Sequence, residues 1–299
     1  MIAAVCEEAL DAARRAAPAG VEVRELPPDG FDAAALQQVS FIVPGWMSGG
    51  SLDVLAELPE LRVVQVLSAG TDWIESRVPE WATLCNARGT RDIPMAEWAL
   101  AALVGATTGL LQAARDRSWD YIPPAELHGQ TVLVVGHGSI GRALEARLEP
   151  LGAHVVGVAG HARDGVHGPE QLPDLLPQAD AVVVLAPLTD ATRGMVNAEF
   201  LARMRDDTLF VNAGRGAVVD TEALLRELES GRLRAVLDVV EPEPLPADHP
   251  LWRAHGTLAI TAHFAGDSPQ ADERAADLAA AQLRRFALGE PLANVVPRR

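Results

Sequence analysis

Three side chains that together suit carbonyl chemistry each follow a short apolar stretch in the last third of the chain: Arg215, Glu243 and His263. An arginine can hold a carboxylate with two parallel hydrogen bonds and polarise the adjacent carbonyl. A histidine can donate a proton to a developing alkoxide and take it back in the reverse direction. A glutamate on the other ring nitrogen orients that histidine and stabilises its protonated form. The set suits reduction of a carbonyl by hydride transfer.

Each of these residues also has an ordinary structural explanation when it is considered alone. Arg215 fits a surface ion pair, Glu243 a solvated loop carboxylate, and His263 a hydrogen-bonded residue at the end of a strand. A parallel sheet would bring the three together, because the loops that follow successive strands meet at one edge. Ligands of open parallel sheets bind beyond that carboxyl edge.

The glycine-rich run Gly136-His137-Gly138-Ser139-Ile140-Gly141 is the strongest evidence for such a sheet. It directly follows the apolar residues 131–135 and precedes a helical pattern over 142–151. The first glycine permits a tight turn, the second lets the backbone approach a pyrophosphate, and the third lets helix pack on strand. Helix N–H groups then face the anion. We therefore predict dinucleotide binding at Gly136, Gly138, Ser139, Ile140 and Gly141.

Apolar stretches alternate with helical patterns along the whole chain, which predicts parallel sheets covered by helices. In the first part we expect strands over 2–6, 21–24, 40–44 and 61–67, and short helices over 32–38 and 51–58. In the second part we expect strands over 131–135, 154–158, 181–185, 208–212, 235–239 and 257–261, with helices over 197–204 and 221–230. A long helix from about 94 to 117 lies between the two parts, and an amphipathic helix over 269–288 is expected to return to the first.

Composition narrows the possible function. The 299 residues are 48% hydrophobic, enough for one or two domains with a sizeable core, and the net charge of −16 argues against a nucleic-acid partner. We find neither a basic leader nor an apolar run that could cross a membrane, so we expect a cytoplasmic protein. With two cysteines, no lysine and no metal-ligand spacing of histidines, the sequence predicts no disulfide framework, no Schiff base and no metal site.

The chain resembles the D-isomer-specific 2-hydroxyacid dehydrogenases, and among them the glyoxylate/hydroxypyruvate reductases. The segments that carry the resemblance occur in the family's order, at 67–72, 96–97, 136–141, 186–192, 212–216, 219–220, 238–244, 249–252 and 261–266. The resemblance implies an α/β protein with a Rossmann dinucleotide-binding domain over 97–266. It also implies a flavodoxin-like parallel α/β substrate domain over 1–96 and 267–299.

The resemblance also implies roles for individual residues. Arg215, Glu243 and His263 correspond to the family's catalytic residues, and Asp238 to the aspartate that contacts the nicotinamide carboxamide. Other residues correspond to positions that surround the ligands: Ser68, Ala69 and Gly70 in the loop whose N–H groups receive the substrate carboxylate, and Pro187 and Thr192 beside the cofactor. Related enzymes dimerise through the long helix, so we expect a homodimer.

The chain departs from the family at three positions, one of which is Ala262, where the family usually has proline before the catalytic histidine. An acidic residue is expected at the end of the second Rossmann strand to bind the ribose of NAD, but Ala159 stands there. Nearby, His161 and Arg163 either meet a 2′-phosphate or are solvated, and we predict a preference for NADP with NAD possible. Arg91 replaces a frequent asparagine, and it either reaches an acidic substrate group or is simply exposed.

We therefore expect an NAD(P)-dependent oxidoreductase that converts a small 2-oxoacid into a D-2-hydroxyacid, with glyoxylate or hydroxypyruvate as the first choice of substrate. Trp46 follows an expected strand and either lines the substrate pocket or lies in the core. The alternative function is a nucleotide-sensing binding protein, like the corepressors built on the same fold, because a fold does not by itself define an activity.

Overall fold

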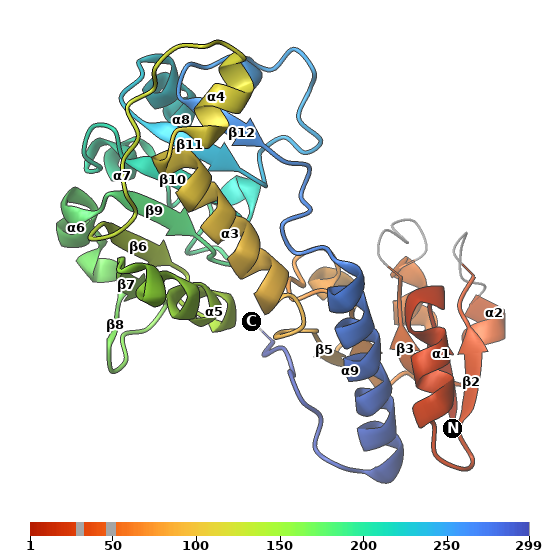
Figure 1. Cartoon of the computed structure of the whole chain (residues 1–299). Helices are drawn as coiled ribbons and strands as arrows, with labels where there is room; N and C mark the ends of the chain where they lie inside the picture. Colours follow the sequence, from red (N-terminus) through yellow and green to blue (C-terminus); the bar gives the residue numbers. More distant parts are fainter. Residues whose placement is uncertain (28–32, 46–51, 299) are drawn as a thin grey trace. The chain divides into compact units, whose positions relative to one another are not determined.

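The computed structural model describes residues 1–27, 33–45 and 52–298, and the chain divides into two compact units (Figure 1). Unit 1 comprises Met1–Arg91 and Asp267–Arg299, and unit 2 comprises Asp92–Gly266. From the sequence, we predicted that the chain enters the second unit between residues 96 and 97 and returns to the first between residues 266 and 267. In the structure the chain enters unit 2 earlier, because the first helix of that unit already begins at Asp92.

Unit 1 contains a five-stranded parallel sheet in the order β2-β1-β3-β4-β5. This is the strand order of flavodoxin-like folds, which the sequence predicted. The strands are β1 (Ile2–Val5), β2 (Glu22–Glu25), β3 (Val39–Val43), β4 (Val63–Gln65) and β5 (Thr83–Cys85). We did not predict β5, because three residues are too few to show a periodic pattern.

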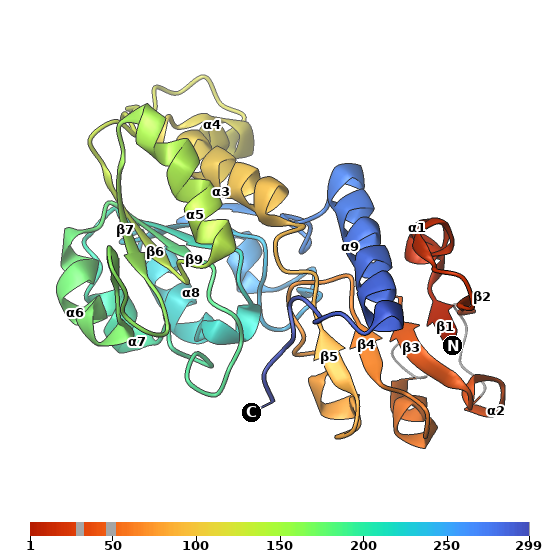
Figure 2. The same ribbon diagram turned by 90° about the horizontal axis from the view of Figure 1, so that it is seen from below.

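Helices and 3-10 turns cover both faces of this sheet. α1 (Glu7–Ala16), which the sequence analysis missed, and α9 (Pro269–Leu288) lie side by side on one face (Figure 2). The other face is covered by apolar residues of the turn η1 (Leu52–Glu57), where a helix was predicted. α2 (Ala33–Leu36) and η2 (Glu75–Arg77) complete the unit. Its two halves, distant in sequence, therefore form one core.

Unit 2 contains a seven-stranded parallel sheet in the order β12-β11-β10-β9-β6-β7-β8. The chain reverses its direction of winding between β6 and β9, which is the switch point where Rossmann folds bind dinucleotides. The strands are β6 (Thr131–Val135), β7 (His154–Val158), β8 (Val166–His167), β9 (Ala181–Val184), β10 (Leu209–Asn212), β11 (Arg234–Leu237) and β12 (Thr257–Ile260). All but the two-residue β8 were predicted.

Both faces of the unit 2 sheet are buried, as a parallel sheet requires. One face packs against α3 (Asp92–Thr107) and α5 (Ser139–Leu148), with Leu103 and Leu144 fully buried. The other packs against α6 (Leu172–Leu175), α7 (Ala198–Ala202) and α8 (Thr221–Glu229). Short 3-10 turns are η3 (Glu149–Leu151), η4 (Pro169–Gln171), η5 (Leu176–Gln178), η6 (Gly216–Val218) and η7 (Pro250–Trp252).

The prediction of one long helix from about 94 to 117 is wrong, because two helices occupy that stretch. α3 ends at Thr107, and α4 (Leu110–Asp116) leaves it at an angle of 75°. Gly109 between them has φ 75°, a left-handed conformation that glycine adopts without strain. Among the described helices no single one meets the length and apolarity needed to span a membrane; α3 and α4 do so only as a bent pair.

Candidate active site

The glycine-rich turn connects β6 to α5 at the switch point. Gly136 has φ 101°, and a Cβ there would lie 2.4 Å from the backbone nitrogen of Ala186, so only glycine fits. Gly138 is different, because the nearest atom to a Cβ there would be 3.9 Å away. Close packing at Gly136 therefore forms the turn, while the backbone at Gly138 stays open to a ligand.

The first turn of α5 presents hydrogen-bond donors. The N–H groups of Ser139, Ile140 and Gly141 precede the helical hydrogen bonds, and none has a hydrogen bond to another part of the described chain. The Ser139 hydroxyl donates to the Asp92 carboxylate at 3.0 Å. A helix N-terminus with open N–H groups fits the pyrophosphate of a dinucleotide. These residues therefore fit the predicted cofactor.

The ring of His137 packs inside this turn. It is 3% exposed, and a Cβ on Gly157 of β7 would lie 2.7 Å from it. Its Nε2 lies 2.9 Å from Glu145 Oε2, and its Nδ1 is buried without a hydrogen-bond partner in the described chain. His137 is thus part of the packing of the turn, a role that the glycine pattern alone did not indicate.

The loop after β7 carries the residues predicted to determine the cofactor. Ala159 donates its N–H to the His167 carbonyl at 2.9 Å, and no carboxylate stands at its position. The Arg163 guanidinium donates to the carbonyl of His137, in the glycine turn itself. The exposed His161 ring contacts only the carbonyl of Gly160 among the contacts described. Arg163 therefore lies beside the turn, whereas His161 folds onto its own loop.

The loop after β9 is closed by a threonine. The Thr192 hydroxyl donates to the Pro187 carbonyl at 2.6 Å and accepts from the Thr189 N–H at 2.8 Å. Both predicted residues, Pro187 and Thr192, therefore belong to one compact loop at the carboxyl edge of the sheet. Gly214, after β10, packs against this strand end, because a Cβ there would lie 2.6 Å from the Ala186 carbonyl oxygen.

Arg215 lies in a loop that its own strand holds. Asn212, the last residue of β10, accepts from the Gly214 N–H at 3.1 Å and donates to the Arg215 carbonyl at 3.2 Å. The guanidinium donates to the Gly214 carbonyl at 2.8 Å. A Cβ on Gly216 would lie 1.8 Å from the Val240 carbonyl oxygen, so the loops after β10 and β11 are in direct backbone contact.

Glu243 and His263 form the pair that the sequence suggested. Glu243 Oε1 lies 3.0 Å from His263 Nδ1, and the two side chains are 37% and 35% exposed. His263 Nε2 has no hydrogen bond in the described part of the protein. The glutamate therefore fixes the ring and leaves Nε2 available for proton transfer.

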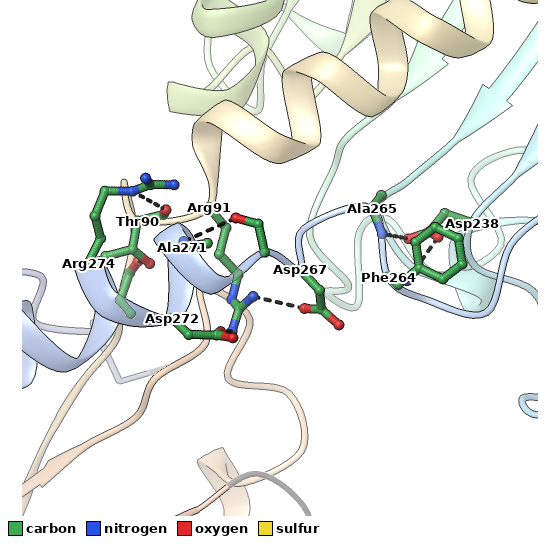
Figure 3. Close-up of polar contacts among 11 residues, drawn as sticks. Thr90, Arg91, Asp238, Phe264, Ala265, Asp267, Ala271, Asp272 and Arg274 are labelled. Carbon is green, nitrogen blue, oxygen red and sulfur yellow. Dashed lines mark hydrogen bonds and ion pairs between the residues drawn. The ribbon is translucent and has the colours of Figure 1, made fainter. Parts of the chain in front are cut away.

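Asp238 holds the loop that carries His263. Its carboxylate accepts from the N–H groups of Phe264 and Ala265, both at 3.0 Å (Figure 3). It also accepts from the Thr261 hydroxyl at 2.5 Å. Its backbone carbonyl accepts from the His263 N–H at 2.9 Å. The loop needs this support because His263 has φ 54°, a conformation that costs energy for a residue with a Cβ. Contact of Asp238 with the nicotinamide stays a prediction.

The remaining predicted residues lie in unit 1. Ser68, Ala69 and Gly70 form the loop after β4 and are buried or half-buried. Arg91 donates to Asp267 at 2.8 Å and to Asp272 at 2.9 Å, so its guanidinium joins the two segments at which the chain leaves and re-enters unit 1 (Figure 3). Neither option that we considered for Arg91 included this structural role. Trp46 lies outside the described residues.

Two residues of unit 1 that contact the 68–70 loop were missed by the sequence analysis as site residues. Trp73 Nε1 lies 3.2 Å from the Ser68 hydroxyl, and Asn86 Nδ2 donates to the Ala69 carbonyl at 2.8 Å. Recognition of β5 would have indicated Asn86, which directly follows that strand. Across the described chain there is no group of three or more potential metal ligands.

Comparison with known proteins agrees with this geometry. The sequence model of the family "D-isomer specific 2-hydroxyacid dehydrogenase, NAD binding domain" matches residues 98–265. A family member from Xanthobacter autotrophicus, solved with NADPH and MES, superposes with a TM-score of 0.84 at 31% identity, over 99% of this chain and 98% of the other. The chain belongs to the D-isomer-specific 2-hydroxyacid dehydrogenases, which are oxidoreductases that use a nicotinamide cofactor.

Two further relatives have defined activities. The NADPH-dependent glyoxylate/hydroxypyruvate reductase of Sinorhizobium meliloti superposes with a TM-score of 0.82 at 28% identity, covering 99% of this chain and 97% of the other. The glyoxylate reductase of Thermofilum pendens is 31% identical over 80% of this chain and 75% of its own length. The chain spans about half the length of the D-3-phosphoglycerate dehydrogenases that it also matches.

Proposed function

We propose that this protein reduces glyoxylate or hydroxypyruvate to the corresponding hydroxyacid and prefers NADPH. The observation that carries the proposal is the 3.0 Å pair of Glu243 and His263 at the carboxyl edge of the unit 2 sheet, in the two loops that follow the loop of Arg215. Two of the relatives described above are named as reductases of these substrates.

Hydride for the carbonyl carbon would come from a nicotinamide cofactor held at the glycine turn, while the side chains of this protein bind the substrate and transfer the proton. Arg215 polarises the carbonyl and holds the adjacent carboxylate. His263 donates its Nε2 proton to the oxygen that becomes a hydroxyl, while Glu243 stabilises the protonated ring. By the family resemblance alone, we assign the substrate carboxylate to the open N–H groups of the 68–70 loop.

A spectrophotometric assay with NADPH and a panel of 2-oxoacids tests the activity. We expect turnover with glyoxylate or hydroxypyruvate, and a loss of about 100- to 10,000-fold in His263→Gln with unchanged NADPH binding. Near-normal reduction by that variant would remove His263 from the mechanism. Tight binding of NADPH without reduction of any 2-oxoacid would favour the nucleotide-sensing alternative instead.

The proposed preference for NADPH rests on the loop after β7. Ala159 removes the repulsion between a carboxylate and a 2′-phosphate, and Arg163 already lies against the glycine turn. We expect Arg163→Ala to lose about 10- to 100-fold in NADPH preference, since a charge-assisted hydrogen bond contributes roughly 1.5–3 kcal/mol. Ala159→Asp should move preference toward NADH.

The measurement is kcat/KM for NADPH and NADH in each protein. Arg253→Ala is a matched control, because this exposed arginine of unit 2 precedes β12 and so lies at the amino edge of the sheet, away from the ligand edge. A wild-type preference for NADH would contradict the proposal. An equal effect of the Arg253 and Arg163 substitutions would show that general surface charge determines the preference.

We also propose that two copies of the chain associate through the α3–α4 region. Leu110 is 66% exposed, and the segment after α4 presents a fully exposed Trp119 and an 85% exposed Tyr121. Large apolar side chains gathered on one segment are typical of interfaces. Light scattering should give twice the chain mass, and Trp119→Ser with Tyr121→Ser should lower it; a monomeric wild-type protein would refute the proposal.

A further inference from the structure

In the loop after β4, the carbonyl oxygens of residues 68–70 all accept a hydrogen bond from the protein. The Ser68 carbonyl accepts from the Ala87 N–H at 2.8 Å, and the Ala69 carbonyl accepts from Asn86 Nδ2 at 2.8 Å. The Gly70 carbonyl accepts from the Ser68 hydroxyl at 2.7 Å. The acceptors of residues 68–70 are therefore all satisfied within unit 1.

The N–H donors of the same three residues, unlike the carbonyl oxygens, are not bound by the described part of the protein. The N–H groups of Ser68, Ala69 and Gly70 make no hydrogen bond to any residue in the described ranges. Consecutive N–H groups without protein partners, beside carbonyls that are all occupied, form a surface that favours an anion. The carbonyl oxygens of residues 68–70 are thus bound by the protein, while the N–H groups remain available to an anion.

Two side chains, Trp73 and Asn86, help to hold the carbonyl oxygens of this loop against the protein. Trp73 Nε1 donates to the Ser68 hydroxyl at 3.2 Å, which orients the hydroxyl proton toward the Gly70 carbonyl. Asn86 Oδ1 accepts from the Arg88 N–H at 3.2 Å, which orients its amide so that Nδ2 meets the Ala69 carbonyl. Ser68 is 6% exposed, so an unpaired hydroxyl at this position would be costly.

We infer that Trp73 and Asn86 are positioning residues for the substrate carboxylate. By holding the carbonyl side of the 68–70 loop, they keep the Ala69 and Gly70 N–H groups directed at the carboxylate. Without them the loop could rotate a carbonyl toward the anion, which repels it. The inference rests on the proposed function, because that proposal assigns the carboxylate to this loop.

The test compares Trp73→Phe and Asn86→Ala with wild type. The phenylalanine keeps an aromatic six-membered ring and removes the indole N–H together with the rest of the pyrrole ring, a change in size that the control below reproduces. Trp81→Phe is the matched control, since Trp81 is a 52% exposed tryptophan of the same unit and has no hydrogen bond to the loop. Three quantities are measured: kcat and KM for glyoxylate at saturating NADPH, KM for NADPH, and the Kd of oxamate for the NADPH-loaded protein by calorimetry. Thermal unfolding confirms that each variant is folded.

We expect KM for glyoxylate and Kd of oxamate to rise about 3- to 10-fold in both variants, the effect of losing one neutral hydrogen bond. kcat, KM for NADPH and the Trp81→Phe control should stay near wild type. A variant with merely damaged folding would lower kcat and unfold earlier instead. If Asn86→Ala does not fold, Trp73→Phe alone decides the matter.

The outcomes separate this inference from the proposed function. A wild-type enzyme that reduces glyoxylate, with variants unchanged in KM and in oxamate affinity, overturns the inference and leaves the function intact. A wild-type protein that binds oxamate but reduces no 2-oxoacid overturns the function, while weaker oxamate binding in both variants still supports the inference. Absence of oxamate binding and of reduction overturns both.

Discussion

Replacement of Asp238 by asparagine tests whether one buried carboxylate organises the catalytic loop. Asp238 is 2% exposed, and its two oxygens accept from Thr261, Phe264 and Ala265. An asparagine has one oxygen and one NH2 group. In either orientation an NH2 group then faces a backbone N–H, so at least one hydrogen bond is replaced by two opposed donors.

The expected cost follows from that geometry. Loss of one hydrogen bond to a charged group removes about 1.5–3 kcal/mol, and a buried donor without a partner adds about 1–3 kcal/mol. We expect the free energy of unfolding to fall by about 2.5–6 kcal/mol in Asp238→Asn. The loop from Thr261 to Ala265 also carries His263, and a displacement of about 1 Å at a catalytic group can lower turnover by about 100-fold.

Urea unfolding and steady-state reduction of glyoxylate measure the two effects. Asp220→Asn is the matched control, because Asp220 caps α8 through one hydrogen bond to the Ala223 N–H at 2.9 Å, and asparagine caps helices equally well. An Asp238→Asn protein as stable and as active as that control would refute the reasoning. If only KM for NADPH rises, Asp238 contacts the cofactor and does not anchor the loop.

Three further substitutions or treatments follow from the site. Arg215→Lys keeps the charge but loses the planar fork, so kcat/KM for glyoxylate should fall on the order of 10- to 100-fold with KM for NADPH unchanged; a change confined to NADPH would assign Arg215 to the cofactor. Glu243→Gln removes the carboxylate that holds His263 Nδ1 at 3.0 Å, so kcat for glyoxylate should fall with KM for NADPH unchanged, and an unaltered kcat would uncouple the pair. Burial raises the pKa of Cys6 to about 12, with Glu8 adding to the effect, and that of Cys85 to about 11, so both thiols stay protonated at pH 8. A colorimetric thiol reagent should label neither in the folded protein and both in urea; rapid labelling of the folded chain would contradict that burial.

The sequence by itself determined ten of the twelve strands that the structure describes, all except the short β5 and β8, together with the glycine turn and the order of the candidate site residues. Strands buried on both faces must be continuous apolar runs, and residues 131–135 are recognisable for that reason. The glycine spacing is equally recognisable in the sequence, although the contact that excludes a Cβ at Gly136 is with the distant backbone of Ala186. Once the sheet is parallel, the loops with Arg215, Glu243 and His263 must lie at the same edge, so their grouping follows from chain order.

Only the tertiary structure decided which partners these elements meet. Gly109, between α3 and α4, packs against Ile122, since a Cβ there would lie 2.9 Å from Ile122 Cγ2. Arg91 pairs with carboxylates 176 and 181 residues further along the chain, and no local pattern encodes such pairs. The same holds for Asp238, which is separated from Ala265 by 27 residues. Hydrogen bonds of this kind depend on distances of a few tenths of an ångström, and those distances exist only after the core has packed.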